Sequence, residues 1–241
     1  MLVAAAVCPC PPLLVPEIAG GAAPELDAAR AACTDALGVL AASRPDRLVV
    51  VGPAAEHGCG PYPEGTPGSF RGFGADIVVR LGRGDGEAGD VGAGRLLPPS
   101  LAVGAWLLGR AGWGDAPIEG LGVGEPFGAE RCVRTGREVA GRAGRVALLV
   151  MGDASACRTL KAPGYLDERA APFDAEMGRA LGKADVTALE TMDVELARQL
   201  MASGRAPWQV LAGAGKDAGL SGELLYEDAP YGVGYVVATW S

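Results

Sequence analysis

Two thiols stand one residue apart near the start of the chain. The stretch CPCPPLLVPEIAGG, from Cys8 to Gly21, places Cys8 and Cys10 between a short apolar run and a series of prolines. Paired thiolates bind ions such as Zn²⁺ and Cu(I), or take part in redox exchange. A single C-x-C without a second pair is also typical of buried thiols that pack as small hydrophobes. The stretch leaves a metal site, a redox site and a structural turn open.

Polar side chains follow two further apolar runs. His57 and Cys59 come after the run that ends in Gly52-Pro53, and Asp153 and Ser155 come after LLVM. Ligand sites in open α/β sheets gather at the carboxyl ends of strands, so the three turns would converge if their strands are neighbours. The alternatives are a solvated His57 and an Asp153 that only caps a turn.

A long polar loop, RTLKAPGYLDERAAPFD over 158–174, follows the Asp153 turn. Such a loop beside a strand end is a candidate lid or binding segment, in which Lys161 or Tyr165 would act as an acid or hold an anion. The alternative is a solvated connection whose surface ion pairs contribute little. We therefore take Asp153, Ser155, Lys161 and Tyr165 as candidate catalytic residues, and Cys8, Cys10, His57 and Cys59 as candidate metal ligands.

The apolar patterning predicts an α/β fold. A buried strand over 1–8, an amphipathic helix over 24–43 and a buried strand beginning at Arg47 form a strand–helix–strand unit, which predicts parallel strands in a doubly wound sheet. A further strong strand precedes Asp153, two helices are expected within 171–203, and a helix follows Pro207. The last twenty residues predict one or two strands, and RGDGEAGDVGAG, 83–94, an exposed mobile loop. We expect one three-layer α/β/α domain with a mostly parallel or mixed sheet.

The composition of the chain favours some classes of protein and disfavours others. The chain has 241 residues, of which 49% are hydrophobic and 21% charged, with a formal net charge of −8. These values favour a compact cytoplasmic protein with reduced thiols, and they disfavour nucleic acid as a partner. No apolar run reaches the length that spans a membrane, and no convincing signal peptide is found. The usual dinucleotide, P-loop and α/β-hydrolase motifs are absent from the sequence.

Several segments, taken in order, resemble the LigB-type catalytic subunit of class III extradiol ring-cleavage dioxygenases, and more distantly the Memo-type proteins. They are CPCPPLLVPE, PDRLVVVGPAAEH, TPGSFRGFG, LLVMGDASA, APFDAEM, PWQVLAGAG and PYGVGYVV. The resemblance runs through most of the chain and implies one α/β domain with a mixed sheet. It also implies non-haem Fe(II) held by two His and one carboxylate, with open positions for a catechol and dioxygen, and it implies oligomers or partner subunits.

The ligand positions implied by this resemblance carry other residues here. Cys10 stands where the first His is expected, and Ala54 and Ala55 stand nearest the second, with His57 slightly beyond. Ala156 corresponds to the catalytic His, and the segment ASGRAP before Trp208 contains no acid at the carboxylate position. Because the chain has one His, a two-His ligand set cannot form within it.

Three hypotheses follow. The first is a diverged enzyme that binds a small aromatic substrate at a rim formed by Cys8, Cys10, His57, Cys59, Asp153 and Ser155. The second is a non-catalytic protein that holds Zn or Cu on its thiols, which suit such ions better than Fe(II). The third is a pseudoenzyme that serves as a homo-oligomeric scaffold or partner subunit.

Overall fold

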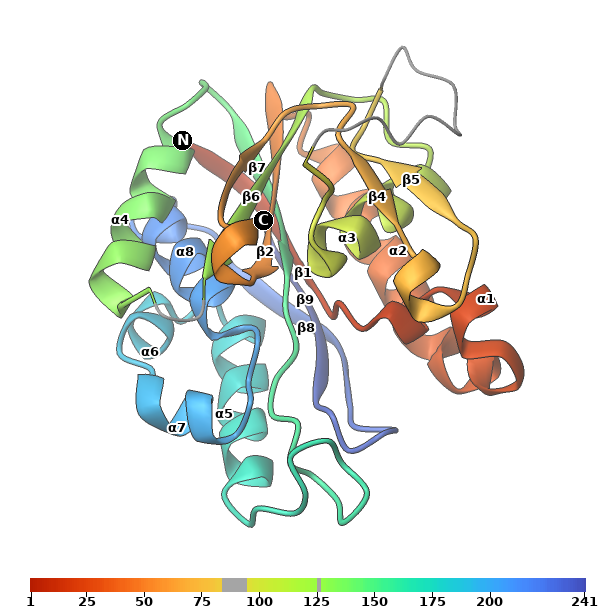
Figure 1. The fold of residues 1–241 in the computed structure, drawn as a ribbon. Helices are drawn as coiled ribbons and strands as arrows, with labels where there is room; N and C mark the ends of the chain where they lie inside the picture. Colours follow the sequence, from red (N-terminus) through yellow and green to blue (C-terminus); the bar gives the residue numbers. More distant parts are fainter. Residues whose placement is uncertain (84–94, 125–126) are drawn as a thin grey trace.

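A mixed sheet forms the centre of the molecule in the computed structural model, which describes residues 1–83, 95–124 and 127–241 (Figure 1). Within that part, seven strands are ordered β3-β6-β2-β7-β1-β9-β8. Strands β6, β2, β7 and β1 run parallel, whereas β3, β9 and β8 are antiparallel to their neighbours. The strands are β1 (Leu2–Cys8), β2 (Arg47–Ala54), β3 (Gly60–Tyr62), β6 (Ile118–Gly124), β7 (Val146–Met151), β8 (Gly222–Asp228) and β9 (Tyr235–Trp240). A separate ribbon pairs β4 (Pro67–Ser69) with β5 (Val78–Arg80).

Helices cover both faces of the sheet (Figure 1). On one face α2 (Asp27–Ala42) and α3 (Pro99–Arg110) pack over the strands, preceded by the short α1 (Pro16–Ala19). The other face carries α4 (Ala129–Ala140), α5 (Ala170–Gly182), α6 (Val186–Glu190), α7 (Val194–Gln199) and α8 (Arg205–Gly215). The central strands are buried on both sides, which explains why β7 is an unbroken apolar run.

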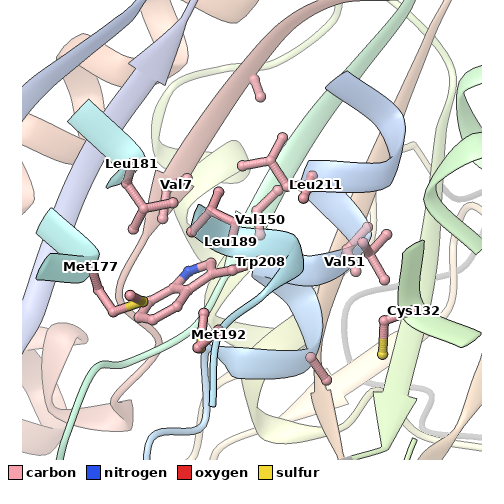
Figure 2. Packing of buried hydrophobic residues seen from close by; sticks show 14 of the residues in the cluster. Val7, Val51, Cys132, Val150, Met177, Leu181, Leu189, Met192, Trp208 and Leu211 are labelled. Atoms are coloured by element: carbon pink, nitrogen blue, oxygen red, sulfur yellow. The ribbon is translucent and has the colours of Figure 1, made fainter. Parts of the chain in front are cut away.

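Trp208 of α8 lies at the centre of the helical layer formed by α4 to α8. Figure 2 shows its ring among Met177, Leu189 and Met192, beside Val150 of β7. The Trp208 side chain is completely buried. The packing joins α5, the α6–α7 segment and α8 into one apolar layer, which fixes the segment before α8 against the end of β7.

Strand β7 has a special position, because its outgoing connection leaves toward the opposite face from those of its two neighbours. The chain after β1 and β2 runs to α2 and α3, whose apolar residues pack in one core cluster. The chain after β7 runs to α5, which packs in the other cluster. The carboxyl end of β7 is therefore a topological switch point on both sides, the place where open α/β sheets form their binding crevices.

The predicted fold class, a three-layer α/β/α arrangement around a mixed sheet, is confirmed. Strands β1 and β2 are parallel as predicted, but β7 lies between them. The helix predicted over 24–43 begins at Asp27, after a 3-10 segment. The region of the two predicted helices holds three, because Asp185 and Asp193 cap new N-termini. The predicted loop over 83–94 lies outside the described residues except for Arg83. Within the described ranges no helix is long and apolar enough to cross a membrane.

Candidate functional site

The carboxylate of Asp153 meets Cys10 at the carboxyl ends of β1 and β7. The backbone N–H of Cys10 donates to Asp153 Oδ1 over 2.8 Å, and the Cys10 sulfur lies 3.8 Å from Oδ2. The two strands are paired up to Cys8 and Met151, and the Gly152 N–H donates to the Cys8 carbonyl over 3.0 Å. The ladder thus carries both residues to the same sheet edge, at the switch point between β1 and β7.

Ser203 completes this cluster from the segment just before α8. Its hydroxyl accepts from the Asp153 N–H at 3.2 Å and also interacts with the Cys10 thiol. The Gly204 N–H donates to the Asp153 carbonyl at 2.8 Å. A Cβ on Gly152 would lie 2.5 Å from the Gly204 Cα, so the close approach of the two segments requires glycine. We refer to Cys10, Asp153 and Ser203 as the switch-point site.

Burial sets the protonation of this site. It raises the pKa of the Asp153 carboxyl to about 6, although the hydrogen bonds from Cys10 oppose the shift. Burial, followed by the charge of Asp153, raises the pKa of the Cys10 thiol well above its usual value. Burial and the same charge also raise the pKa of Tyr235, at the start of β9. Asp153 is therefore the group in this cluster that exchanges a proton near neutral pH, and Cys10 faces it as a neutral thiol.

Ser155 belongs to a second, deeper network. Its N–H and its hydroxyl donate to the two carboxylate oxygens of Asp174 over 2.8 and 2.9 Å. Asp174, on α5 and 1% exposed, also accepts from Arg158 Nη1 over 2.9 Å. The backbone of Gly234 bonds to both Ala154 and Ser155 over 2.8 Å, which ties the turn before β9 to this loop. In this geometry Ser155 anchors the chain beside the switch-point site.

The predicted metal ligands lie in three separate places. Cys8 is buried and hydrogen-bonded to Cys33 of α2, which with burial raises the pKa of its thiol well above the usual value. Cys10 faces Asp153. Beyond β2, the half-buried Cys59 sulfur lies 3.4 Å from the Ala55 carbonyl oxygen, and the exposed His57 borders a cavity of about 300 Å³. The structure therefore brings Cys10 to Asp153, and it divides the C-x-C thiols between different partners.

Lys161 and Tyr165 lie on the loop that leaves the end of β7. Lys161 is exposed and borders a cavity of about 700 Å³. Tyr165 has a positive φ of 62° and is 62% exposed. Neither residue lies in the switch-point site. Of the four candidate catalytic residues, Asp153 belongs to that site, Ser155 anchors the chain beside it, and the other two lie on the loop.

The donor set does not fit the Fe(II) centre that the resemblance implies. That centre needs two imidazoles and a carboxylate, and the chain has a single His. Among residues 1–83, 95–124 and 127–241, no group of three His, Cys, Asp or Glu side chains is placed to hold a metal ion. At the switch point a thiol, a carboxylate and a hydroxyl meet instead.

Two polar residues of this region are not among the candidates that the sequence indicates. Ser203 comes from the ASGRAP segment, where the resemblance implies a carboxylate ligand and gives no reason to select a hydroxyl. Asp174 lies in APFDAEM, one of the matching segments, and it is a buried acid on an otherwise amphipathic helix. A buried carboxylate needs partners, and that requirement is the signal that could have identified Asp174.

Comparisons with known proteins inform the fold. No protein-family model and no curated protein matches the chain. A solved structure, the crystal structure of the uncharacterized protein JW3007 from Escherichia coli K12, is similar with a TM-score of 0.54 and 14% sequence identity. The similarity covers 99% of this chain and 100% of that one. The two proteins therefore share an architecture over their whole length.

Proposed function

We propose that this chain is a diverged LigB-like protein without extradiol ring-cleavage activity, and that its switch-point site binds a small molecule carrying a weakly acidic hydroxyl group. A phenol or catechol is the simplest such ligand. In the proposal Asp153 accepts the proton of that hydroxyl, and Cys10 and Ser203 border the position where the hydroxyl binds.

The place of the site supports the proposal. Cys10 stands at a sequence position where the LigB resemblance implies an iron ligand, and Ser203 lies in the segment where it implies another. These two positions, far apart in the sequence, interact with each other and with Asp153. In this account the positions of the former ligands still meet at one place, while their iron-binding side chains have been replaced.

The contacts of Asp153 with Cys10 and Ser203 are the observation that carries the proposal. Asp153 is partly buried, and this burial raises the pKa of its carboxyl to about 6. A general base works best when its pKa lies near the working pH, which is where burial has moved this carboxyl. A cavity of about 160 Å³ is lined by Ser203 together with residues of α7 and of the segment that follows it.

The proposal is tested by loading the protein with Fe(II) under anaerobic conditions, adding a panel of catechols, and then recording oxygen uptake. We expect no uptake above free Fe(II), because two imidazole ligands are missing. Calorimetric titration with catechol should show binding that Asp153→Asn weakens. Stoichiometric oxygen consumption with a ring-opened product would overturn the proposal, and so would equal binding by both proteins.

The thiol alternative makes a different prediction. Structural zinc in a Cys-rich site would raise the unfolding temperature and would be lost in a Cys8→Ser/Cys10→Ser double variant. In the structure Cys8 is hydrogen-bonded to Cys33 and Cys10 faces Asp153, so we expect no shift on addition of Zn²⁺. A stoichiometric metal content that disappears in the double variant would favour the thiol hypothesis instead.

A further inference from the structure

Away from the switch-point site, a cavity lies between the loop that follows β7 and the turn that joins β8 to β9. Its volume is about 700 Å³, and Arg158 and Lys161 line it together with Tyr231 and Thr159. Its described lining contains two basic side chains and no carboxylate. From this combination we infer that the cavity binds a small organic monoanion, a carboxylate with an apolar body.

The charges in and around the cavity suit a monoanion. Arg158 donates from Nη1 to Asp174, and the Arg158 side chain remains 30% exposed. Asp174 balances the charge of Arg158, so the exposed Lys161 supplies the remaining positive charge of the lining, while Glu25 lies against the Tyr231 hydroxyl at one border of the cavity. A guanidinium held on one side by a buried carboxylate is oriented in advance, and its remaining N–H groups match the geometry of a ligand carboxylate.

Apolar side chains also line the cavity, so a ligand that fits it should carry a hydrocarbon part as well as an anionic group. Leu160 and Leu166 are 61% and 47% exposed, which leaves two large aliphatic side chains in solvent on one short loop. Pro230 and Tyr231 also line the cavity, and the Tyr231 hydroxyl donates to the Ala22 carbonyl over 3.3 Å. A ligand with a hydrocarbon body would cover this surface.

The two segments around the cavity are fixed to each other, so the site is largely formed without ligand. The Arg158 N–H donates to the Gly232 carbonyl over 3.0 Å. Gly232 has a φ of +75°, and a Cβ there would lie 2.6 Å from both the Ala162 Cβ and the Thr159 hydroxyl. Within the loop, the Gly164 N–H donates to the Ala156 carbonyl over 2.9 Å. Such preorganisation reduces the entropy lost on binding.

Octanoate is a suitable probe, with octan-1-ol as its uncharged counterpart, in calorimetric titrations of the full chain. We expect octanoate to bind with a dissociation constant below about 1 mM, and octan-1-ol to bind roughly tenfold more weakly. Lys161→Glu should weaken octanoate binding by about tenfold or more, whereas Lys161→Arg should keep it. Leu166→Ser should also weaken binding, through the apolar side of the cavity.

Two matched control variants distinguish this cavity from a general effect of surface charge and from the switch-point site. Lys183→Glu makes the same charge change at an exposed position on the end of α5 and should leave octanoate binding unchanged. Asp153→Asn should also leave it unchanged, so the failure of one proposed site is distinguishable from the failure of the other. No octanoate binding, equal binding of octan-1-ol, or equal losses in Lys161→Glu and Lys183→Glu would overturn the inference.

Discussion

Asp153 accepts a 2.8 Å hydrogen bond from the backbone N–H of Cys10, and its second carboxylate oxygen lies 3.8 Å from the Cys10 sulfur. This contact joins residues 143 positions apart in the sequence. It exists because the connection after β1 and the connection after β7 leave toward opposite faces of the sheet. A carboxyl group held in that crevice is desolvated by the fold around it, and the consequences can be measured.

Asp153→Asn should change how stability depends on pH. The pKa of Asp153 is raised from 3.8 to about 6, so the folded chain holds this proton more tightly than the unfolded chain does. The stabilisation by this proton is fully present below about pH 3.8 and is lost as the pH rises through 6. At pH 8 the variant should therefore be more stable than the wild type, by about 3 kcal/mol at most. Urea unfolding at several pH values measures the difference.

The unfolding measurements at low pH serve as a control for this comparison of the wild type with Asp153→Asn. The gap between the two proteins should close as the pH falls from 6 to 4, because the wild-type carboxyl is then protonated as well. Asp217→Asn, an exposed change after α8, should show no comparable trend. A constant gap across the pH range would mean that Asp153 is not the group that titrates.

Asp174 should be far more important for stability than Ser155. Removing the Asp174 side chain by Asp174→Ala leaves three donors of Ser155 and Arg158 without their partner, and the loss of a buried charged acceptor costs about 3–5 kcal/mol. Ser155→Ala removes one hydrogen bond and should cost about 1–2 kcal/mol. Denaturant unfolding of both variants checks the order, and a Ser155→Ala cost equal to that of Asp174→Ala would contradict it.

Gly234→Ala should destabilise the chain by more than about 2 kcal/mol. A Cβ at this position would lie 2.4 Å from Asp174 Oδ2 and 2.9 Å from the Ala154 Cβ. Gly21→Ala is the matched control, because a Cβ there meets no atom within 4 Å. Thermal unfolding of the two variants measures the contrast. Similar melting temperatures for both would show that the turn before β9 does not pack on Asp174 in this way.

The thiols should differ strongly in their reaction with N-ethylmaleimide at pH 7. Cys59 is half-buried and should be modified first, whereas Cys8 is completely buried and Cys10 is 7% exposed. The raised pKa values of Cys8 and Cys10 lower the fraction of thiolate, which is the reactive form. Peptide mass spectrometry over time gives the order of modification. Labelling of Cys8 as fast as that of Cys59 would contradict the buried pair with Cys33.

The sequence allowed the principal strands and the fold class to be predicted, because buried strands are continuous apolar runs whose signal is local. The place of Asp153 just after the end of a strand was also predictable, since it directly follows such a run. The position of β7 between β1 and β2 was not, because strand order depends on how distant segments pack. Ser203 and Asp174 reach the region from the start of α8 and from α5, so their contacts with Asp153 and Ser155 are tertiary and leave no local pattern.

A spectral titration of 4-nitrocatechol, whose absorbance reports the ionisation of its hydroxyl groups, tests the central claim most directly. Wild type and Asp153→Asn are compared between pH 5 and 8, a range that brackets the raised pKa of about 6. The account predicts that the wild type binds the probe, that its bound spectrum shows loss of a proton, and that binding weakens as the pH falls below about 6. Asp153→Asn should lose both effects. Binding with the same spectrum and the same pH dependence in the two proteins would contradict the claim that Asp153 is the proton acceptor of this site.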